Sequence, residues 1–189
     1  SKKEGEMCHK KLVWLLPVII VLAISCKKAK EEAKEATGEV IVAMTDDPSS
    51  KSKQVAKVYF KMQVELSKDG NEWVKVAAGS LYVEAGNPAL TYFNKDNPTE
   101  IDTGAYKMLK LVIEKSTIVS TTALDLDLNI THDIVIDCSN TPISVPPADT
   151  ITLVIDINTE KWWSDFGTLP DTNCWQNWAN CFSVSVINE

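Results

Sequence analysis

The sequence predicts an all-β fold, an antiparallel β-sandwich with Greek-key connections. From residue 38 onward, short runs in which apolar and polar side chains alternate are separated by turn-forming residues, and about nine or ten such runs follow one another. No amphipathic helical pattern of comparable length interrupts them. The roughly 150 residues with this pattern suit a single domain, which we place at residues 38–189.

The first strands show the pattern most sharply. Residues 39–45 form a predicted strand, and a cluster of turn-forming residues at 46–50 ends it. In residues 56–66 one face is apolar and the other polar, as expected for a strand that covers a core and faces water. A turn at residues 68–71 then leads into a strand at residues 72–76.

The later strands follow from the same period of two residues. A polar loop at residues 94–103 separates two of these strands from the four that come after it. The remaining predicted strands are residues 80–84, 89–93, 106–118, 124–130, 151–157 and 182–187.

The N-terminal segment has the layout of a secretory signal peptide or anchor helix. A pair of lysines precedes an apolar run at residues 12–24, and small residues precede Cys26. This run is shorter than the about 20 apolar residues that span a bilayer. Residues 22–26 are similar to the lipobox of bacterial lipoproteins. The resemblance implies that residues 1–25 are removed as a lipoprotein signal peptide and that Cys26 is acylated.

Two other interpretations stay open, a signal peptide without lipid attachment and an uncleaved anchor helix. Residues 1–6 precede Met7, the expected natural start, and we expect them to have no function. Residues 26–37 contain many lysines and glutamates but no large apolar side chain after Cys26, so we expect a charged tether there. The expected location is the bacterial cell envelope, periplasmic or surface-exposed, with acyl chains in the membrane.

The composition argues against a nucleic-acid partner. The chain carries a net charge of −7, and because residues 1–25 contribute +2, the part from Cys26 onward carries −9. An acidic surface repels phosphate backbones. All basic residues are lysines, so the chain lacks the planar guanidinium fork that binds phosphate in a bidentate manner.

Three cysteines remain after the predicted processing, in a compartment where disulfides form. Cys174 and Cys181 enclose six residues and are the natural pair. Cys138 is then left either as a buried free thiol or as an alternative partner.

Three segments carry a family resemblance. They are residues 38–48, which end in Thr-Asp-Asp-Pro, residues 58–76, with an Asp-Gly turn, and residues 103–113, which begin with Thr-Gly-Ala-Tyr. These segments resemble the domain-of-unknown-function family 4382 (DUF4382), lipoprotein-associated domains of bacteria and archaea, over residues 38–157. The resemblance implies an Ig-like or prealbumin-like sandwich on the cell envelope, with no established activity and no catalytic residues to transfer. The sequence after Asn158 departs from the family pattern.

An aromatic cluster lies in this C-terminal part. Trp162, Trp163, Trp175 and Trp178 occur within a polar stretch, and flat aromatic rings in polar loops are typical of sugar-binding and partner-binding surfaces. The same rings would also close the open end of the sandwich, stiffened by the predicted disulfide. The two roles are compatible.

A metal site is the alternative. Asp125, Asp127 and Asn129 alternate along one predicted strand and carry the hard oxygen ligands that Ca²⁺ prefers. Their spacing of about 6.6 Å along a strand is wide for a compact cage, and a solvated polar face explains them more simply. Residues 150–163 resemble the terminal strand of methanobactin-associated periplasmic copper-binding proteins, which makes copper a second candidate, bound through His132 and thiols.

We expect no enzymatic activity. His132 is the only histidine left after the predicted processing, and a lone histidine at a strand end is usually a surface turn residue. The sequence therefore predicts a lipid-anchored envelope protein with a non-enzymatic binding or structural domain. We expect its Trp-rich loop to contact a glycan or another envelope protein, with binding of calcium or copper as the alternative.

Overall fold

The computed structural model describes residues 36–46, 48, 55–121, 126–128, 131–161 and 179–188. These residues belong to one compact unit that begins at Ala36. No helix among them is long and apolar enough to cross a membrane. The predicted signal segment, Cys26 and the tether as far as residue 35 lie outside the described residues.

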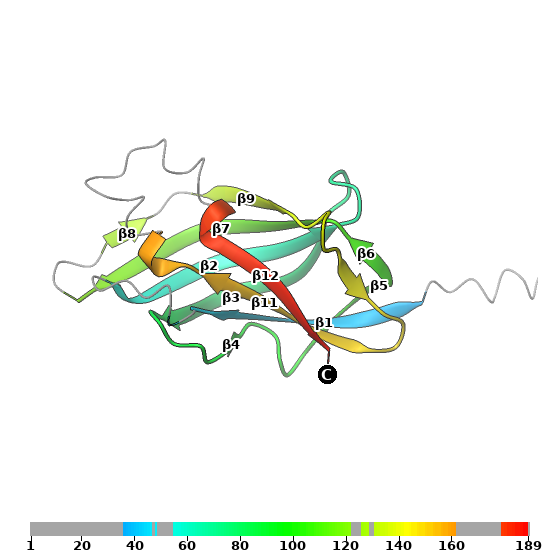
Figure 1. The fold of residues 1–189 in the computed structure, drawn as a ribbon, viewed down its shortest axis with the longest axis horizontal. Coiled ribbons are helices and arrows are strands. Elements are labelled where there is room, and N and C mark those ends of the chain that lie inside the picture. Colours follow the sequence, from blue (N-terminus) through cyan, green and yellow to red (C-terminus); the bar gives the residue numbers. More distant parts are fainter. Residues whose placement is uncertain are drawn as a thin grey trace, which may run out of the picture. The chain divides into compact units, whose positions relative to one another are not determined.

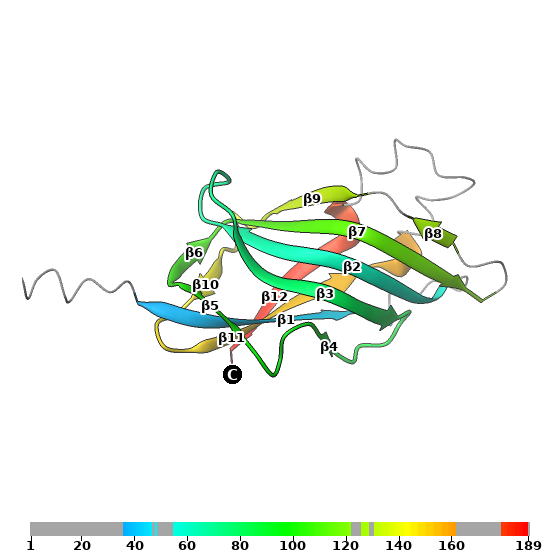
Figure 2. The same ribbon diagram turned by 180° about the vertical axis from the view of Figure 1, so that it is seen from behind.

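The described chain is an all-β sandwich, as the sequence predicts (Figures 1 and 2). The first sheet consists of β1 (Thr37–Thr45), β4 (Thr91–Tyr92), β5 (Thr99–Asp102), β11 (Thr150–Ile157) and β12 (Phe182–Asn188). The second consists of β2 (Val55–Ser67), β3 (Val74–Glu84), β7 (Met108–Ser120), β8 (Leu126–Leu128) and β9 (His132–Asp137). A separate pair consists of β6 (Gly104–Tyr106) and β10 (Ile143–Val145).

In each sheet three longer strands lie side by side, and two short strands follow along the edge of the third. The first is ordered β12-β11-β1-β4 and the second β3-β2-β7-β8. In the first sheet β5 also pairs with β1, and in the second β9 also pairs with β7. Two short strands in succession therefore cover the outer edge of one long strand in each sheet, so neither long edge is left open there.

One strand pair departs from the predicted antiparallel arrangement. β1 and β11 run parallel, from Glu39 opposite Thr150 to Thr45 opposite Asp156, whereas the other described pairs are antiparallel. Parallel strands need a long connection, and here the connection contains the whole second sheet. Both strands are buried on both faces along most of their length, which explains their nearly continuous apolar runs.

The short strands differ most from the prediction. The segments 72–76 and 80–84, predicted as two strands, form the single strand β3. The predicted strand at residues 89–93 is reduced to β4, and β5 lies in the predicted polar loop. β9 and β10 have no counterpart among the predicted strands.

The inward faces of the long strands form the core. Phe60 of β2 meets Phe182 of β12 across the sandwich, with ring centroids 6.5 Å apart. From Val58 to Leu66 the alternation in β2 is the one predicted, whereas at its start Val55 rather than Ala56 is buried. Its core-facing side chains, each at most 2% exposed, are Val58, Phe60, Met62, Val64 and Leu66.

The side chain of Asn94 joins the two sheets. Its Nδ2 donates hydrogen bonds to the carbonyl oxygens of Val40 in β1 and Val76 in β3, at 3.0 and 3.2 Å. Its Oδ1 accepts a hydrogen bond from the N–H of Val42 at 2.8 Å. A half-buried amide in the predicted polar loop thus bridges backbone groups of both sheets.

Asp46, directly after β1, is a fully buried carboxylate with a structural role. Its Oδ2 accepts hydrogen bonds from the N–H of Gly86 and from the hydroxyl of Thr159, the latter at 2.8 Å. The N–H of Thr159 donates to Oδ1 at 3.4 Å. One side chain therefore ties the end of β1 to the turn after β3 and to the chain just beyond β11.

Tyr106 accounts for the Gly-Ala-Tyr motif. Its side chain is 2% exposed, and its hydroxyl donates a hydrogen bond to the carbonyl oxygen of Asp102 at 2.7 Å. Burial, together with the charge of Asp102, raises the pKa of Tyr106 above its ordinary value. A tyrosine bonded to the backbone a few residues upstream is the arrangement of the tyrosine corner in Greek-key sandwiches. Gly104 lies between them with φ of +136°, a conformation that strains any side chain.

Replacing Asp46 with alanine is expected to lower the free energy of unfolding by roughly 2–3 kcal/mol, because Gly86 and Thr159 lose a charged acceptor inside the fold. Urea denaturation followed by tryptophan fluorescence measures the change. Asp96→Ala, at an exposed loop position, is the matched control and should alter stability by less than about 0.5 kcal/mol. Equal losses from both substitutions would contradict the structural role of Asp46.

Replacing Tyr106 with phenylalanine is expected to lower the free energy of unfolding by about 1 kcal/mol, because the hydrogen bond to Asp102 is lost while the ring still fills its place. The same denaturation experiment measures it. Tyr92→Phe, a half-buried tyrosine in the first sheet, serves as the control. If Tyr106→Phe is as stable as the parent chain, the corner makes no net contribution.

Candidate functional site

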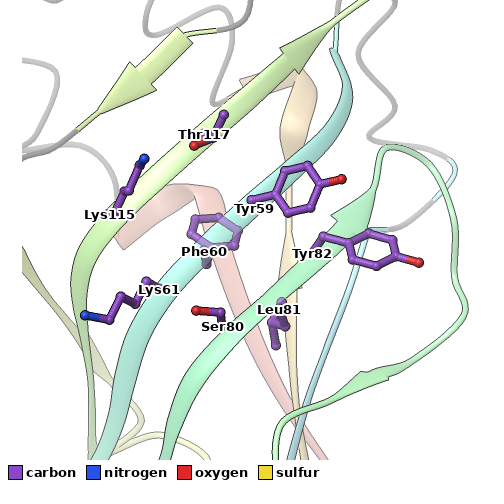
Figure 3. Close-up of a pocket in the computed structure, with 8 residues that line it drawn as sticks. All are labelled: Tyr59, Phe60, Lys61, Ser80, Leu81, Tyr82, Lys115 and Thr117. Carbon is purple, nitrogen blue, oxygen red and sulfur yellow. The ribbon is translucent and has the colours of Figure 1, made fainter.

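An open depression lies on the outer face of the second sheet, across β3, β2 and β7 (Figure 3). Its volume is about 520 Å³. We call it the tyrosine pocket. Its lining residues are Tyr59, Phe60, Lys61, Ser80, Leu81, Tyr82, Lys115 and Thr117.

Two tyrosines dominate one side of the tyrosine pocket. Tyr59 of β2 lies opposite Tyr82 of β3 in the strand register, and their ring centroids are 5.6 Å apart at an interplanar angle of 44°. Each side chain is 43% exposed. In Figure 3 both rings extend to the right from their strands, whereas Lys61 extends to the left and Lys115 lies in the left part of the view. Exposed aromatic rings at polar positions of a strand offer flat faces to a ligand.

A lysine also lies over one of these rings. The Nζ of Lys57 is 5.1 Å from the ring centroid of Tyr82 and 3.4 Å from a carboxylate oxygen of Glu84. A cation over the ring face and an ion pair beside it restrict the orientation of the Tyr82 ring. Lys57 therefore favours the observed orientation of the Tyr82 ring.

The other side of the tyrosine pocket carries paired charges and hydroxyls. The Nζ of Lys61 lies 2.7 Å from a carboxylate oxygen of Glu114. The Nζ of Lys115 lies 3.7 Å from a carboxylate oxygen of Asp127. Thr117 donates its hydroxyl hydrogen to Asp127. Hydrogen bonds from Lys61 and then Gln63 lower the pKa of Glu114 below its ordinary value, so that this carboxylate stays ionised. The rim thus offers several donors and acceptors with little net charge.

A register shift shapes the hollow. In the β2–β7 pairing Lys61 lies opposite Lys115 but Met62 lies opposite Ile113, so Glu114 is an extra residue on β7. Such a bulge bends the strand and redirects its side chains. On the other side of β2, the residues that share the outer face with Tyr82 toward the start of β3, Ser80 and Ala78, are small. Large rings beside small side chains leave the depression open.

All four residues of the predicted aromatic site lie outside the described residues. They are Trp162, Trp163, Trp175 and Trp178, and Cys174 and Cys26 lie outside as well. The contact role of the Trp-rich loop, the Cys174–Cys181 disulfide and the acylation of Cys26 therefore stay predictions. Cys181 itself is described and is 1% exposed.

Cys138 is a buried free thiol, one of the two roles open from the sequence. Its side chain is 9% exposed, and its Sγ lies 3.8 Å from the carbonyl oxygen of Ile136. Burial, and then the neighbouring charge of Asp137, raises the pKa of the Cys138 thiol.

The predicted metal ligands are only partly described. Asp127 lies on β8 and contacts Thr117 and Lys115, whereas Asp125 and Asn129 fall outside the described residues. Within the described ranges, no group of three or more His, Cys, Asp or Glu side chains is placed to hold a metal ion. Binding of calcium or copper stays a prediction.

His132 lies within a strand rather than in a turn. It is the first residue of β9, half-buried, and pairs with Ile113 of β7. His132 is thus at a strand end, as the sequence suggested, but in a strand that was not among the predicted ones. The residues lining the tyrosine pocket include neither a histidine nor a cysteine.

Sequence reasoning did not single out the tyrosine pocket. The signal for it was a large aromatic residue, Tyr59, at one of the polar positions in the alternation of β2. Its partner Tyr82 becomes visible only when the register of β3 is known.

Three kinds of comparison with known proteins found no match. The chain matches no family model, no curated protein and no solved structure. The resemblance of residues 38–157 to domain-of-unknown-function family 4382 therefore stays a prediction.

Proposed function

We propose that this protein is a lipid-anchored, non-enzymatic binding protein of the bacterial cell envelope, whose sandwich binds a glycan in the tyrosine pocket. The observation that carries the proposal is the pair of exposed rings, Tyr59 and Tyr82, beside an open hollow of about 520 Å³. The apolar face of a sugar ring stacks on an aromatic face, and its hydroxyls bond to a polar rim.

The size and the charge of the tyrosine pocket favour a glycan over a protein partner. Small-molecule sites have volumes of about 300–1,000 Å³, whereas a stable protein interface buries about 800 Å² on each partner and has few charged residues at its centre. Here two lysine–carboxylate pairs, those of Lys61 and Lys115, lie at the hollow itself. Paired ammonium and carboxylate groups are suitable donors and acceptors for sugar hydroxyls.

The rim also disfavours strongly charged ligands. The lysines at the pocket have carboxylate partners, and the chain as a whole carries a net charge of −7. A polyanion such as nucleic acid would meet long-range repulsion without a free cluster of cations in the described pocket. A glycan of low net charge fits this rim best.

The anchor part of the proposal is supported by the position of the fold. The compact unit begins at Ala36 and β1 at Thr37, the last two residues of the predicted charged tether. The predicted order along the chain is thus a lipid on Cys26, a tether and then the sandwich.

Removing the rings tests the glycan site. Tyr59→Ala and Tyr82→Ala are each expected to weaken glycan binding about tenfold or more, because loss of one stacking face removes roughly 1–2 kcal/mol. A glycan array identifies a ligand of the full chain in detergent, and titration calorimetry then measures its affinity for the variants.

Two further variants make this test specific. Tyr92→Ala is the matched control, because Tyr92 belongs to the first sheet but also lies beside a lysine. The Nζ of Lys95 is 4.6 Å from the centroid of the Tyr92 ring. The affinity of this variant should equal that of the parent chain. A Trp175→Ala, Trp178→Ala variant tests the Trp-rich loop separately. If binding survives both tyrosine substitutions and is lost with the loop, the tyrosine pocket is not the site.

Mass spectrometry of the N-terminal peptide tests the anchor. The mature chain is expected to begin at Cys26 with diacylglycerol on the thiol and acyl groups that hold the protein in the membrane fraction. Cys26→Ser should leave the chain unacylated and shift it toward the soluble fraction. An unmodified Cys26 in membrane-bound protein rules out lipid anchoring.

A further inference from the structure

β12 forms one edge of the first sheet, beyond β11 (Figure 1). Its seven residues pair with β11 without a register shift, from Phe182 opposite Ile157 to Asn188 opposite Ile151. Within the described residues no strand pairs with its other side. An edge strand presents a row of backbone donors and acceptors that another strand can bind.

The other described edges carry features that oppose such pairing. β4 and β5 have only two and four residues, and Pro98 lies between them. β8 and β9 are also short and carry the aspartates 127, 133 and 137. β3 has charged residues at both ends, and its pairing with β2 contains a bulge. Short strands, charges, prolines and bulges are the means by which proteins protect sheet edges.

β12 has none of these features. Its sequence, Phe-Ser-Val-Ser-Val-Ile-Asn, contains no charge, no proline and no glycine. Val186 is 36% and Ile187 47% exposed. A groove of about 350 Å³ runs beside the strand, lined by Val184 and Val186 on one side and by Cys138, Pro142 and Ile143 on the other.

We propose that β12 is a dimerisation strand that pairs antiparallel with β12 of a second copy of the chain. The strand is self-complementary when all seven residues overlap, because the two-fold axis then passes through Ser185. Val184 lies opposite the partner's Val186, and Ser183 lies opposite the partner's Ile187. The first sheets of the two copies become one continuous sheet.

The side-chain pattern favours this occupant. Val184 and Val186 lie opposite Ile155 and Leu153 of β11, so they share the face of the sheet that covers the core. In the pairing centred on Ser185, Val184 lies opposite the partner's Val186 and Val186 opposite the partner's Val184. These valines also line the groove of each copy. Serine lies on the opposite face of the strand at positions 183 and 185, so that no bulky pair opposes close approach.

The absence of charge on β12 matters because each copy carries a net charge of −7. An acidic strand would bring like charges together, whereas β12 brings together only neutral side chains. Residual repulsion between the two copies is long-range and is screened by salt. Dimerisation is therefore expected to strengthen as the ionic strength rises.

Cross-linking of the full chain in detergent tests the register. Directly opposite residues of antiparallel strands have Cα atoms about 4.5–5.5 Å apart, within the about 4.4–6.8 Å range of a disulfide. Ser185→Cys should therefore give a disulfide-linked dimer on a non-reducing gel under mild oxidation. In Ser183→Cys the two introduced thiols are offset by four residues, about 13 Å along the strands, and should give no more dimer than the parent chain.

The outcomes separate cleanly. At least fivefold more dimer from Ser185→Cys than from Ser183→Cys or the parent chain supports the pairing. Equal yields from the two variants, or a higher yield from Ser183→Cys, overturn it. The parent chain sets the baseline for its own cysteines.

A second experiment measures mass without added cysteines. Val186→Lys places a charge on the edge, a substitution that opposes strand pairing, and should convert the dimer to a monomer in sedimentation velocity runs. Val135→Lys is the matched control, since Val135 is 42% exposed on β9 of the other sheet, and it should stay dimeric. Circular dichroism checks that both variants are folded. A parent chain that is monomeric at ~100 µM, or a Val186→Lys variant that is folded and dimeric, overturns the proposal.

Discussion

The parallel pairing of β1 with β11 is the contact on which the first sheet depends. Glu39 and Thr150, the first residues of this register, are more than a hundred positions apart in the sequence. Among the described strands, β12 pairs only with β11, and β4 and β5 pair only with β1, so both groups need these two strands in place. Asp46 then fixes the far end of the pair by binding Gly86 and Thr159. Contacts of such separation carry a high chain-entropy cost, which is met by burying both faces of both strands.

The strands of the second sheet that carry the tyrosine pocket pair with strands closer to them in the sequence. β2 pairs with β3, its neighbour in the chain, and with β7, so the strands that carry the tyrosine pocket form largely from contacts within one part of the sequence. The pocket follows from two local features, the opposition of Tyr59 to Tyr82 and the extra residue Glu114. The proposed dimerisation strand belongs to the first sheet and the proposed glycan site to the second. Each surface is therefore open to substitution without direct contact with the other.

The sequence alone predicted what depends on local periodicity. The alternation of residues 56–66 correctly assigned the core face of β2 because one row of its side chains is buried and the other is wet. The parallel partner of β1 was not predictable in this way, since an apolar run does not specify which strand lies beside it. The two-residue strand β4 and the bridging role of Asn94 also arise from contacts between distant segments. Among the candidate site residues, Tyr59 was visible as an aromatic residue at a polar position, but its pairing with Tyr82 required the register.

The position of Cys138 has a consequence for oxidative maturation. Thiol–disulfide exchange proceeds through the thiolate, and burial, which raises the pKa of the Cys138 thiol, disfavours this form. Once the strands have assembled, an unpaired sulfur inside the core no longer competes for the remaining cysteines. In the envelope location that we propose, the fold thus favours keeping the Cys138 thiol reduced while exposed thiols oxidise.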